Sequence, residues 1–214
     1  MIILIGGEKG GSGKSCLAQN LSAFLKLKQG RDVLLLDADP QGTTTDWVQE
    51  RLASGRVAEI PSVQASGNIR VVLLDLAKRY EAIVIDAGGQ DSEALRSAMT
   101  VATHLLMPFR PKRRDLKTLE HAEELVRMAI AINPGLQVRA VITQCPTLPS
   151  QLQRINDAKN ACRSYSIEPL QAITYHRNVY DDTDEGGLSV LETDVDGKAQ
   201  DEIIAMATEL LGGN

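Results

Sequence analysis

Residues 6–21 read GGEKGGSGKSCLAQNL, and this stretch decides the fold. It follows the apolar run MIILI and precedes a segment with leucines at helical spacing, so a glycine-rich loop joins a predicted buried strand to a predicted helix. The backbone N–H groups of such a loop, with the positive end of the helix dipole, bind anions such as phosphate. The loop has two lysines, Lys9 and Lys14, although a simple phosphate loop needs only one.

The residues of the loop have distinct predicted roles. Lys14 is expected to reach the β- and γ-phosphates of a nucleotide, and the Ser15 hydroxyl is expected to bind Mg²⁺. The backbone of four residues is expected to surround the phosphates: Gly10, Gly11, Ser12 and Gly13. The strict motif requires glycine where this chain has Glu8. A glycine turn without a ligand is the alternative, but the order of strand, loop, lysine, hydroxyl and helix argues against it.

Strand-like and helix-like segments alternate along the rest of the chain. Strands are predicted at 32–39, 80–89, 104–109, 137–143 and 169–174, with a weaker candidate at 57–63. Helices are predicted at 15–29, 43–53, 68–79, 93–101, 115–131, 150–164 and 196–211, with a short helix or turn at 178–185. This alternation predicts a single α/β domain over residues 1–214, with a doubly wound, mainly parallel sheet flanked by helices.

Three aspartates stand at the ends of predicted strands: Asp37, Asp39 and Asp86. In a doubly wound sheet, ligands bind at the carboxyl ends of the strands, so these side chains are expected to converge on the phosphates. Carboxylates in that place hold Mg²⁺ or orient an attacking water molecule. A single aspartate after a strand is usually a helix cap, but two strands that both end this way indicate a functional site.

Composition excludes several classes of protein. No apolar run reaches 18 residues, and the N-terminal segment has neither a basic region nor a cleavage site, so neither a membrane span nor a signal peptide is expected. The three scattered cysteines, Cys16, Cys145 and Cys162, are typical of the reducing cytoplasm. The net charge of −5 hides an acidic C-terminal part with ten carboxylates and one lysine in residues 180–214. The rest of the chain is basic and could bind nucleic acid locally.

Several segments together resemble the deviant Walker A ATPases of the ParA/MinD superfamily. They are KGGSGKS (9–15), LLLDADPQGTTTDW (34–47) and AIVIDAGG (82–89), followed by 102–120 and 172–192. Among these proteins the chain is most similar to the small ParF-like ParA proteins of plasmid partition, which have no N-terminal DNA-binding domain. The resemblance covers nearly the whole chain. It implies a P-loop NTPase fold, ATP as the ligand and Mg²⁺ as the cofactor.

The resemblance also assigns roles to individual residues. Lys9 matches the extra lysine that reaches across a dimer to the partner's phosphates, and Asp39 matches the aspartate that polarises the attacking water. Asp37 and Asp86 match residues that hold Mg²⁺ through water. Cys16 stands where many relatives have threonine and can still offer its N–H to the α-phosphate.

The later segments carry less definite roles. Arg177 and Tyr180 either line the base pocket or the dimer face, or belong to a packed loop. Residues 87–89 read AGG where many relatives have a Pro-Pro type sequence, so this switch segment is expected to be more flexible. Trp47 is expected in the core, and the three histidines are expected to be structural.

The function implied by the resemblance is a weak ATPase for DNA partition. An ATP-bound homodimer binds nonspecific double-stranded DNA, and a small centromere-binding protein of the ParB or ParG kind stimulates hydrolysis and release. The protein is then expected in the cytoplasm, associated with the nucleoid of a bacterium. Two basic sets are alternative DNA surfaces: one in residues 110–117, and a second formed by Arg154, Lys159 and Arg163.

Three alternatives remain open. The same kind of ATPase could position a protein cargo instead of a plasmid. A MinD-like membrane ATPase would need a basic amphipathic C-terminal helix, and residues 196–211 are acidic. A metabolic enzyme of the dethiobiotin synthetase type shares the fold, but Lys9 and the sequence DADPQG (37–42) argue against it.

Overall fold

The computed structural model describes residues 1–55, 57–89 and 91–212, and within these ranges the chain forms one seven-stranded sheet. The strand order is β3-β2-β4-β1-β5-β6-β7, and every neighbouring pair is parallel. The strands are β1 (Ile2–Ile5), β2 (Val33–Ala38), β3 (Ser62–Gln64), β4 (Ala82–Ala87), β5 (His104–Phe109), β6 (Gln137–Cys145) and β7 (Pro169–Tyr175). The predicted doubly wound fold is therefore confirmed.

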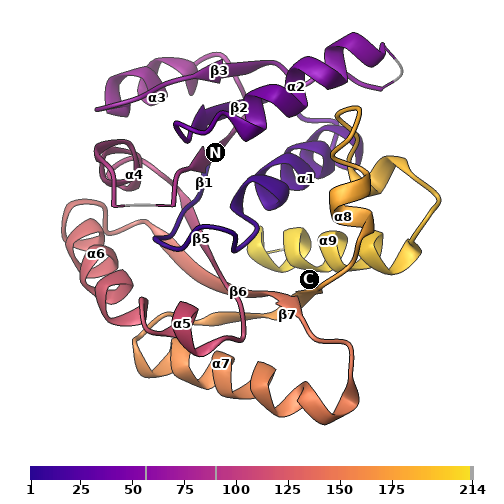
Figure 1. Ribbon diagram of the computed structural model, residues 1–214. Helices are drawn as coiled ribbons and strands as arrows, with labels where there is room; N and C mark the ends of the chain where they lie inside the picture. Colours follow the sequence, from indigo (N-terminus) through magenta and orange to yellow (C-terminus); the bar gives the residue numbers. More distant parts are fainter. Residues whose placement is uncertain (56, 90, 213–214) are drawn as a thin grey trace.

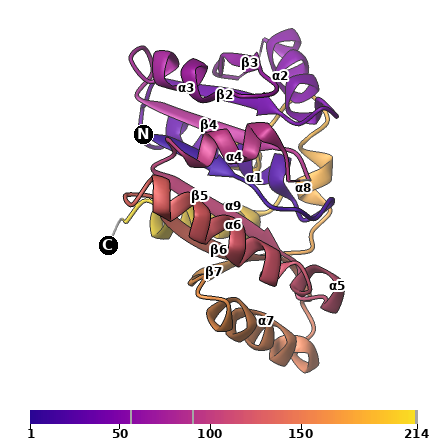
Figure 2. The same cartoon turned by 90° about the vertical axis from the view of Figure 1, so that its left-hand side faces the viewer.

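Helices cover both faces of the sheet, which places an aliphatic core on each side (Figure 1). One face carries α1 (Lys14–Leu27), α2 (Thr43–Ser54), α8 (Val179–Asp182) and α9 (Gly197–Leu210). The other carries α3 (Arg70–Leu76), α4 (Glu93–Met99), α6 (Leu119–Ile132) and α7 (Leu152–Ser164), as Figure 2 shows. The short helix α5 (Arg113–Leu116) and the 3₁₀ turns η1 (Pro149–Gln151) and η2 (Val190–Glu192) lie in connections. The interior strands are buried on both faces, as parallel strands require.

Two predicted elements were wrong in extent. The weak strand predicted at 57–63 is shorter and lies later in the chain: β3 spans only Ser62–Gln64, the three residues that pair with β2. The long helix at 115–131 is broken into α5 and α6 around Lys117 and Thr118. Asp115 is buried there and binds Arg110, while the Thr118 hydroxyl donates to the Asp115 carbonyl. This tertiary contact overrides the helical periodicity.

The acidic C-terminal helix has a structural purpose at the edge strand β7. Glu209 accepts hydrogen bonds from the backbone of Gln171 and Ala172, at 2.7 and 2.8 Å. Glu202 accepts one from the backbone of Tyr175 at 3.0 Å. These carboxylates occupy N–H groups that an exposed edge would otherwise offer to another strand. Within the described ranges no helix combines the length and the apolar character needed to cross a membrane.

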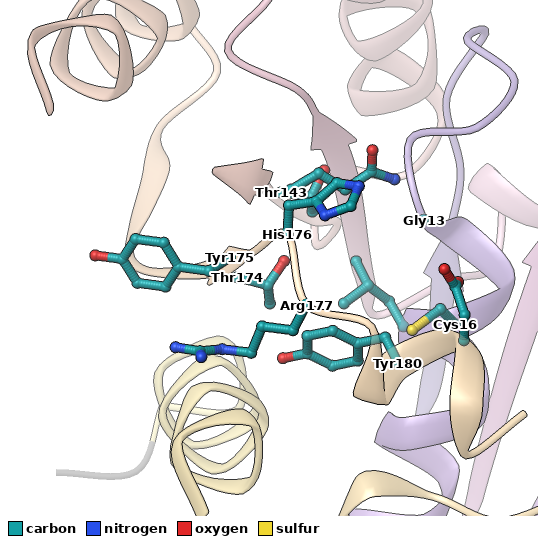
Figure 3. Close-up of a pocket in the computed structure, with 11 residues that line it drawn as sticks. Gly13, Cys16, Thr143, Thr174, Tyr175, His176, Arg177 and Tyr180 are labelled. Carbon is teal, nitrogen blue, oxygen red and sulfur yellow. The ribbon is translucent and has the colours of Figure 1, made fainter. Parts of the chain in front are cut away.

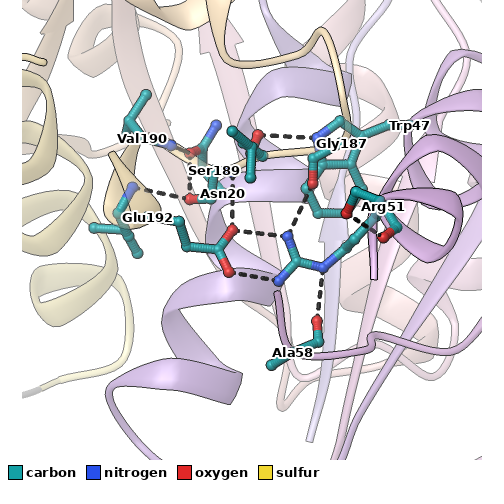
Figure 4. Close-up of polar contacts among 11 residues, drawn as sticks. Asn20, Trp47, Arg51, Ala58, Gly187, Ser189, Val190 and Glu192 are labelled. Atoms are coloured by element: carbon teal, nitrogen blue, oxygen red, sulfur yellow. Dashed lines mark hydrogen bonds and ion pairs between the residues drawn. The ribbon is translucent and has the colours of Figure 1, made fainter. Parts of the chain in front are cut away.

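Helix α2 is anchored by a buried ion pair to the segment that precedes α9 (Figure 4). The guanidinium of Arg51 makes two hydrogen bonds of 2.7 Å to the carboxylate of Glu192 and one of 2.9 Å to the Gly187 carbonyl. Trp47 is buried as predicted, and its indole N–H donates to the Leu188 carbonyl at 3.0 Å. Gly187 has a φ of 69°, and a Cβ there would lie 2.3 Å from the backbone nitrogen of Arg51, so only glycine fits at this position. This network holds the middle and the second half of α2, whose first turn lies next to the predicted nucleotide site.

Candidate active site

The glycine-rich loop between β1 and α1 lies at the carboxyl end of the sheet, with Lys14 buried beneath it. The Lys14 ammonium donates to the Lys9 carbonyl at 3.0 Å, and the Ser12 hydroxyl donates to the same oxygen at 3.1 Å. Gly13 has a φ of 91° where α1 begins, which turns the chain into the helix. Burial lowers the pKa of Lys14, and the carboxylates of Asp86 and Asp39 oppose this shift.

Three residues from distant parts of the chain hold the loop in place. The Thr143 hydroxyl donates to the Ser12 carbonyl at 2.8 Å, and the Gln144 amide donates to the Gly11 carbonyl at 2.9 Å. Arg110 donates to the Gly10 carbonyl at 3.4 Å. Gln144 has a φ of 48°, a left-handed conformation that is costly for this residue type and is common near functional sites. Sequence reasoning missed Thr143 and Gln144, although their place at the end of β6 is a usable signal in a parallel sheet.

The predicted carboxylates converge. Asp37 and Asp86 are direct neighbours in the register of β2 and β4. Asp37 is engaged by the segment that follows β2: Oδ1 accepts from the backbone of Asp39 at 3.0 Å, and Oδ2 accepts from the backbone and hydroxyl of Thr45 at 2.8 and 2.7 Å. Asp37 therefore organises the start of α2. The threonine run 43–45 was not recognised as part of the site from the sequence.

Asp86 has the chemistry of a metal-binding carboxylate. It is fully buried, and its Oδ2 accepts a 2.7 Å hydrogen bond from the Thr44 hydroxyl, while Oδ1 has no partner among the described residues. Burial raises the pKa of Asp86 to about 6, and the nearby hydroxyls of Thr44 and Ser15 oppose this shift. An unpaired buried carboxylate oxygen beside a serine hydroxyl fits hydrated Mg²⁺, which prefers oxygen ligands and keeps several waters. Ser15 and Asp86 are thus the residues that fit Mg²⁺ best, and the role of Asp37 in holding Mg²⁺ through water stays a prediction.

The glycines after β4 lie directly against the loop. A Cβ at Gly89 would stand 3.1 Å from the Gly10 nitrogen and 3.3 Å from the Lys14 ammonium. A Cβ at Gly88 would stand 3.3 Å from Asp39 Oδ1. The sequence predicts that these glycines make the segment flexible. The structure shows a steric reason for Gly88 and Gly89. They allow the backbone after β4 to approach Lys14 and Asp39 closely.

A cavity of about 240 Å³ adjoins the loop beside Gly13 and Cys16 (Figure 3). Its polar walls come from the ends of β6 and β7 and the start of α8: Thr143, Gln144, Thr174, His176, Arg177 and Tyr180. Arg177 lines it, but its guanidinium points away from Gly13 and binds Glu202 at 2.8 Å and Asp196 at 3.4 Å. Burial raises the pKa of the Cys16 thiol to about 12, so this thiol stays neutral. The cavity has donors and acceptors suited to a nucleotide base.

The structure thus brings together most of the predicted site residues. Lys9 is half-exposed, and its ammonium has no hydrogen bond or ion pair with any residue in 1–55, 57–89 or 91–212. The neighbouring Glu8 does not pair with Lys9; its Oε1 lies 3.2 Å from His121 Nε2. Asp39 Oδ1 accepts from the backbone of Gln41 at 3.0 Å. The catalytic and binding roles of these residues stay predictions.

Comparisons with known proteins agree with this geometry. The family model described as "CobQ/CobB/MinD/ParA nucleotide binding domain" matches residues 3–157. The maintenance of carboxysome distribution protein A of Gloeobacter kilaueensis is 28% identical over 194 residues, which cover 89% of this chain and 84% of that protein. The chromosome partitioning protein ParA of Myxococcus xanthus is 24% identical, covering 98% of this chain and 87% of that protein.

A solved structure shows the same fold. The complex of a Cyanothece McdA variant with ATP matches this chain with a TM-score of 0.78 at 16% identity, covering 100% of this chain and 96% of that one. The family match spans well over half of the chain, and the seven-stranded parallel sheet and the loop around Lys14 agree with it. The chain therefore belongs to the CobQ/CobB/MinD/ParA nucleotide-binding family, as an ATPase of the ParA/MinD type.

Proposed function

We propose that this ATPase acts in DNA partition: its ATP-bound homodimer binds double-stranded DNA without sequence preference and leaves it after hydrolysis. Hydrolysis is slow and Mg²⁺-dependent, and a small ParB- or ParG-like centromere-binding protein stimulates it. The protein works in the cytoplasm, on the nucleoid. The observation that carries the proposal is Lys9, a half-exposed cation in the phosphate loop without a partner among the described residues. A cation left unpaired within its own subunit is available for the phosphates held by a second one.

The residues of the site have complementary tasks in this proposal. Lys14 exchanges the Lys9 carbonyl for the phosphates, and the backbone N–H groups of residues 10–16 surround them. Mg²⁺, when bound at Ser15 and Asp86, neutralises the charge that develops on the phosphates. Asp39 orients the attacking water from its place beside Gly88.

The proposed slow hydrolysis has support in the environment of Arg110. This arginine contacts the phosphate loop, but Asp115 holds its guanidinium at 2.7 and 3.1 Å. It is therefore not free to stabilise the transferring phosphoryl group as an arginine finger would. A partner protein that supplies or releases such a group would explain stimulation.

Lys9→Ala is expected to weaken ATP-dependent DNA binding strongly. The measurement is binding of a labelled duplex of arbitrary sequence with ATP, with ADP and without nucleotide. Wild type should bind only with ATP, and the variant should bind at least about tenfold more weakly, because charge-assisted hydrogen bonds contribute about 1.5–3 kcal/mol. Lys28→Ala, which removes an exposed lysine just after α1, is the matched control and should behave as wild type. Binding that ignores the nucleotide, or no binding at low salt, would contradict the proposal.

The two basic sets predicted as alternative DNA surfaces meet in one groove between α5 and α7. Lys112, Arg113 and Lys117 line it from one side and Arg154 from the other, around a volume of about 680 Å³. Three other members of the two sets are engaged elsewhere. Arg110 binds Asp115, Lys159 donates to the Gln171 carbonyl, and Arg163 pairs with Glu168. The groove, and not either run by itself, is the surface that we assign to the DNA backbone.

Arg154→Ala is expected to weaken DNA binding in a salt-dependent way. Each phosphate contact contributes about 0.9 to the slope of log K against log salt concentration, so the variant should lose about one unit of slope. The readout is a salt titration of duplex binding in the presence of ATP. Arg163→Ala, on the same helix but paired with Glu168 at 3.2 Å, should leave the slope unchanged. Equal effects of the two variants would count against the groove.

A second candidate function is the positioning of a protein cargo. It is favoured by the similarity to carboxysome distribution proteins over most of the chain. Deleting the gene distinguishes the two functions in the cell. Plasmid loss supports DNA partition, whereas a misplaced protein body with stable plasmids supports cargo positioning.

A further inference from the structure

His121 lies on α6 between two segments that flank the phosphate site. Its Nε2 is 3.2 Å from Glu8 Oε1 and 3.6 Å from Asp91 Oδ2, and its Nδ1 is 3.6 Å from Glu124 Oε2. Arg96 also binds Asp91. Helix α6 is a firm support, because its opposite face is buried in the core: Leu119, Ala122, Leu125, Val126 and Ala129. The imidazole of His121 therefore contacts both Glu8, the residue before Lys9, and Asp91, which follows the glycines after β4.

This arrangement determines which side chain lies next to the Glu8 carboxylate. Glu8 precedes Lys9 directly and is the carboxylate that covalent geometry places nearest to it along the chain. Glu8 Oε1 instead lies 3.2 Å from His121 Nε2, which makes an ion pair when the imidazole is protonated, and the Lys9 ammonium has no partner among the described residues. We infer that His121 is a positioning residue: by holding Glu8, it keeps Lys9 free to bind the phosphates of a second copy of the chain. The inference rests on the proposed role of Lys9 in the ATP-bound dimer.

The expected effect follows from charge and symmetry. Without the imidazole, Glu8 is released and competes with phosphate for Lys9. An ion pair between Lys9 and the partly exposed Glu8 carboxylate would have only a modest free energy. A symmetric dimer, however, contains the contact between Lys9 and phosphate twice, so the effect on dimerisation is doubled. Loss of His121 should therefore weaken ATP-dependent dimerisation by about threefold to tenfold. Binding of ATP to the monomer should stay unchanged, because Lys14 and its contacts are not altered.

The test measures the ATP-dependent dimer dissociation constant by sedimentation for His121→Gln, Glu8→Gln and the double variant. His121→Gln should dimerise threefold to tenfold more weakly, Glu8→Gln at least as tightly as wild type, and the double variant within about twofold of wild type. Rescue by the second substitution also shows that the single variant is folded. Glu124→Gln is the matched control, because Glu124 touches the same imidazole but does not adjoin Lys9.

The outcomes separate this inference from the proposed function. If wild type does not dimerise with ATP, the proposed function fails and the inference fails with it. If wild type dimerises but the double variant is as weak as His121→Gln, the imidazole does not act through Glu8, and the inference alone is overturned. An unchanged His121→Gln dimer overturns it equally.

Discussion

Glu192→Ala is expected to lower the free energy of unfolding by about 3–5 kcal/mol, because it leaves the buried guanidinium of Arg51 without a counter-charge. The exposed side-chain fractions of the pair are 1% for Arg51 and 8% for Glu192, so both charged groups are shielded from water. For a chain of this length the melting temperature should fall by roughly 6–20 °C. Thermal and urea unfolding followed by circular dichroism measure the effect.

Two controls separate the buried ion pair from a general loss of charge. Glu168→Ala breaks the exposed Arg163–Glu168 pair and should cost less than about 1 kcal/mol. The double variant Arg51→Met with Glu192→Leu removes both charges and should be more stable than Glu192→Ala. The explanation fails if Glu192→Ala and Glu168→Ala lose the same stability, since burial would then have no consequence.

The ion pair also bears on the active site. Arg51 belongs to α2, and the first turn of α2 supplies Thr44 and Thr45, which bind Asp86 and Asp37. The segment after β2 therefore has one fixed end, secured by Arg51 and Trp47, and one end at the carboxylates.

The sequence was sufficient for those parts of the site that depend on local order along the chain. A strand, a glycine loop and a helix in succession predicted the position of Lys14, and parallel strands predicted that Asp37 and Asp86 converge. What could not be predicted are contacts between residues far apart in the chain. Gln144 reaches Gly11 across 133 positions, and Arg51 reaches Glu192 across 141. No periodicity encodes such pairs, because they are determined by the packing of whole elements.

The break between α5 and α6 shows the same limit. Residues 115–131 have good helical periodicity, but Asp115 is used to hold Arg110 against the phosphate loop. Propensity is a weak preference that a buried ion pair can override. Likewise, Glu8 in the phosphate loop contacts His121, which is 113 positions away and which nothing in the sequence places beside the loop. Sequence reasoning therefore identified the chemical groups of the site but not the contacts that position them.

Asp86→Asn is expected to stabilise the nucleotide-free protein while it abolishes Mg²⁺-dependent ATP hydrolysis. The pKa of Asp86 is about 6 in the folded chain and 3.8 as the reference value, so folding disfavours the ionised carboxyl. Ionisation of Asp86 therefore lowers the free energy of unfolding. This destabilisation is absent below pH 4, grows between pH 4 and 6, and is complete above pH 6. A shift of this size corresponds to about 3 kcal/mol. The variant, which cannot ionise there, should therefore melt roughly 6–12 °C higher than wild type at pH 8 in EDTA.

The pH dependence distinguishes this cause from a change in packing. At pH 4.5 the stability difference between Asp86→Asn and wild type should shrink to about 1 kcal/mol, because wild type is then largely protonated when folded. A difference that stays constant from pH 4.5 to pH 8 would show that ionisation of Asp86 is not the cause. A variant less stable than wild type at pH 8 would mean that the unpaired Oδ1 position does not tolerate an amide. If instead stability rises as activity is lost, the chain keeps a destabilising buried charge because Mg²⁺ needs it.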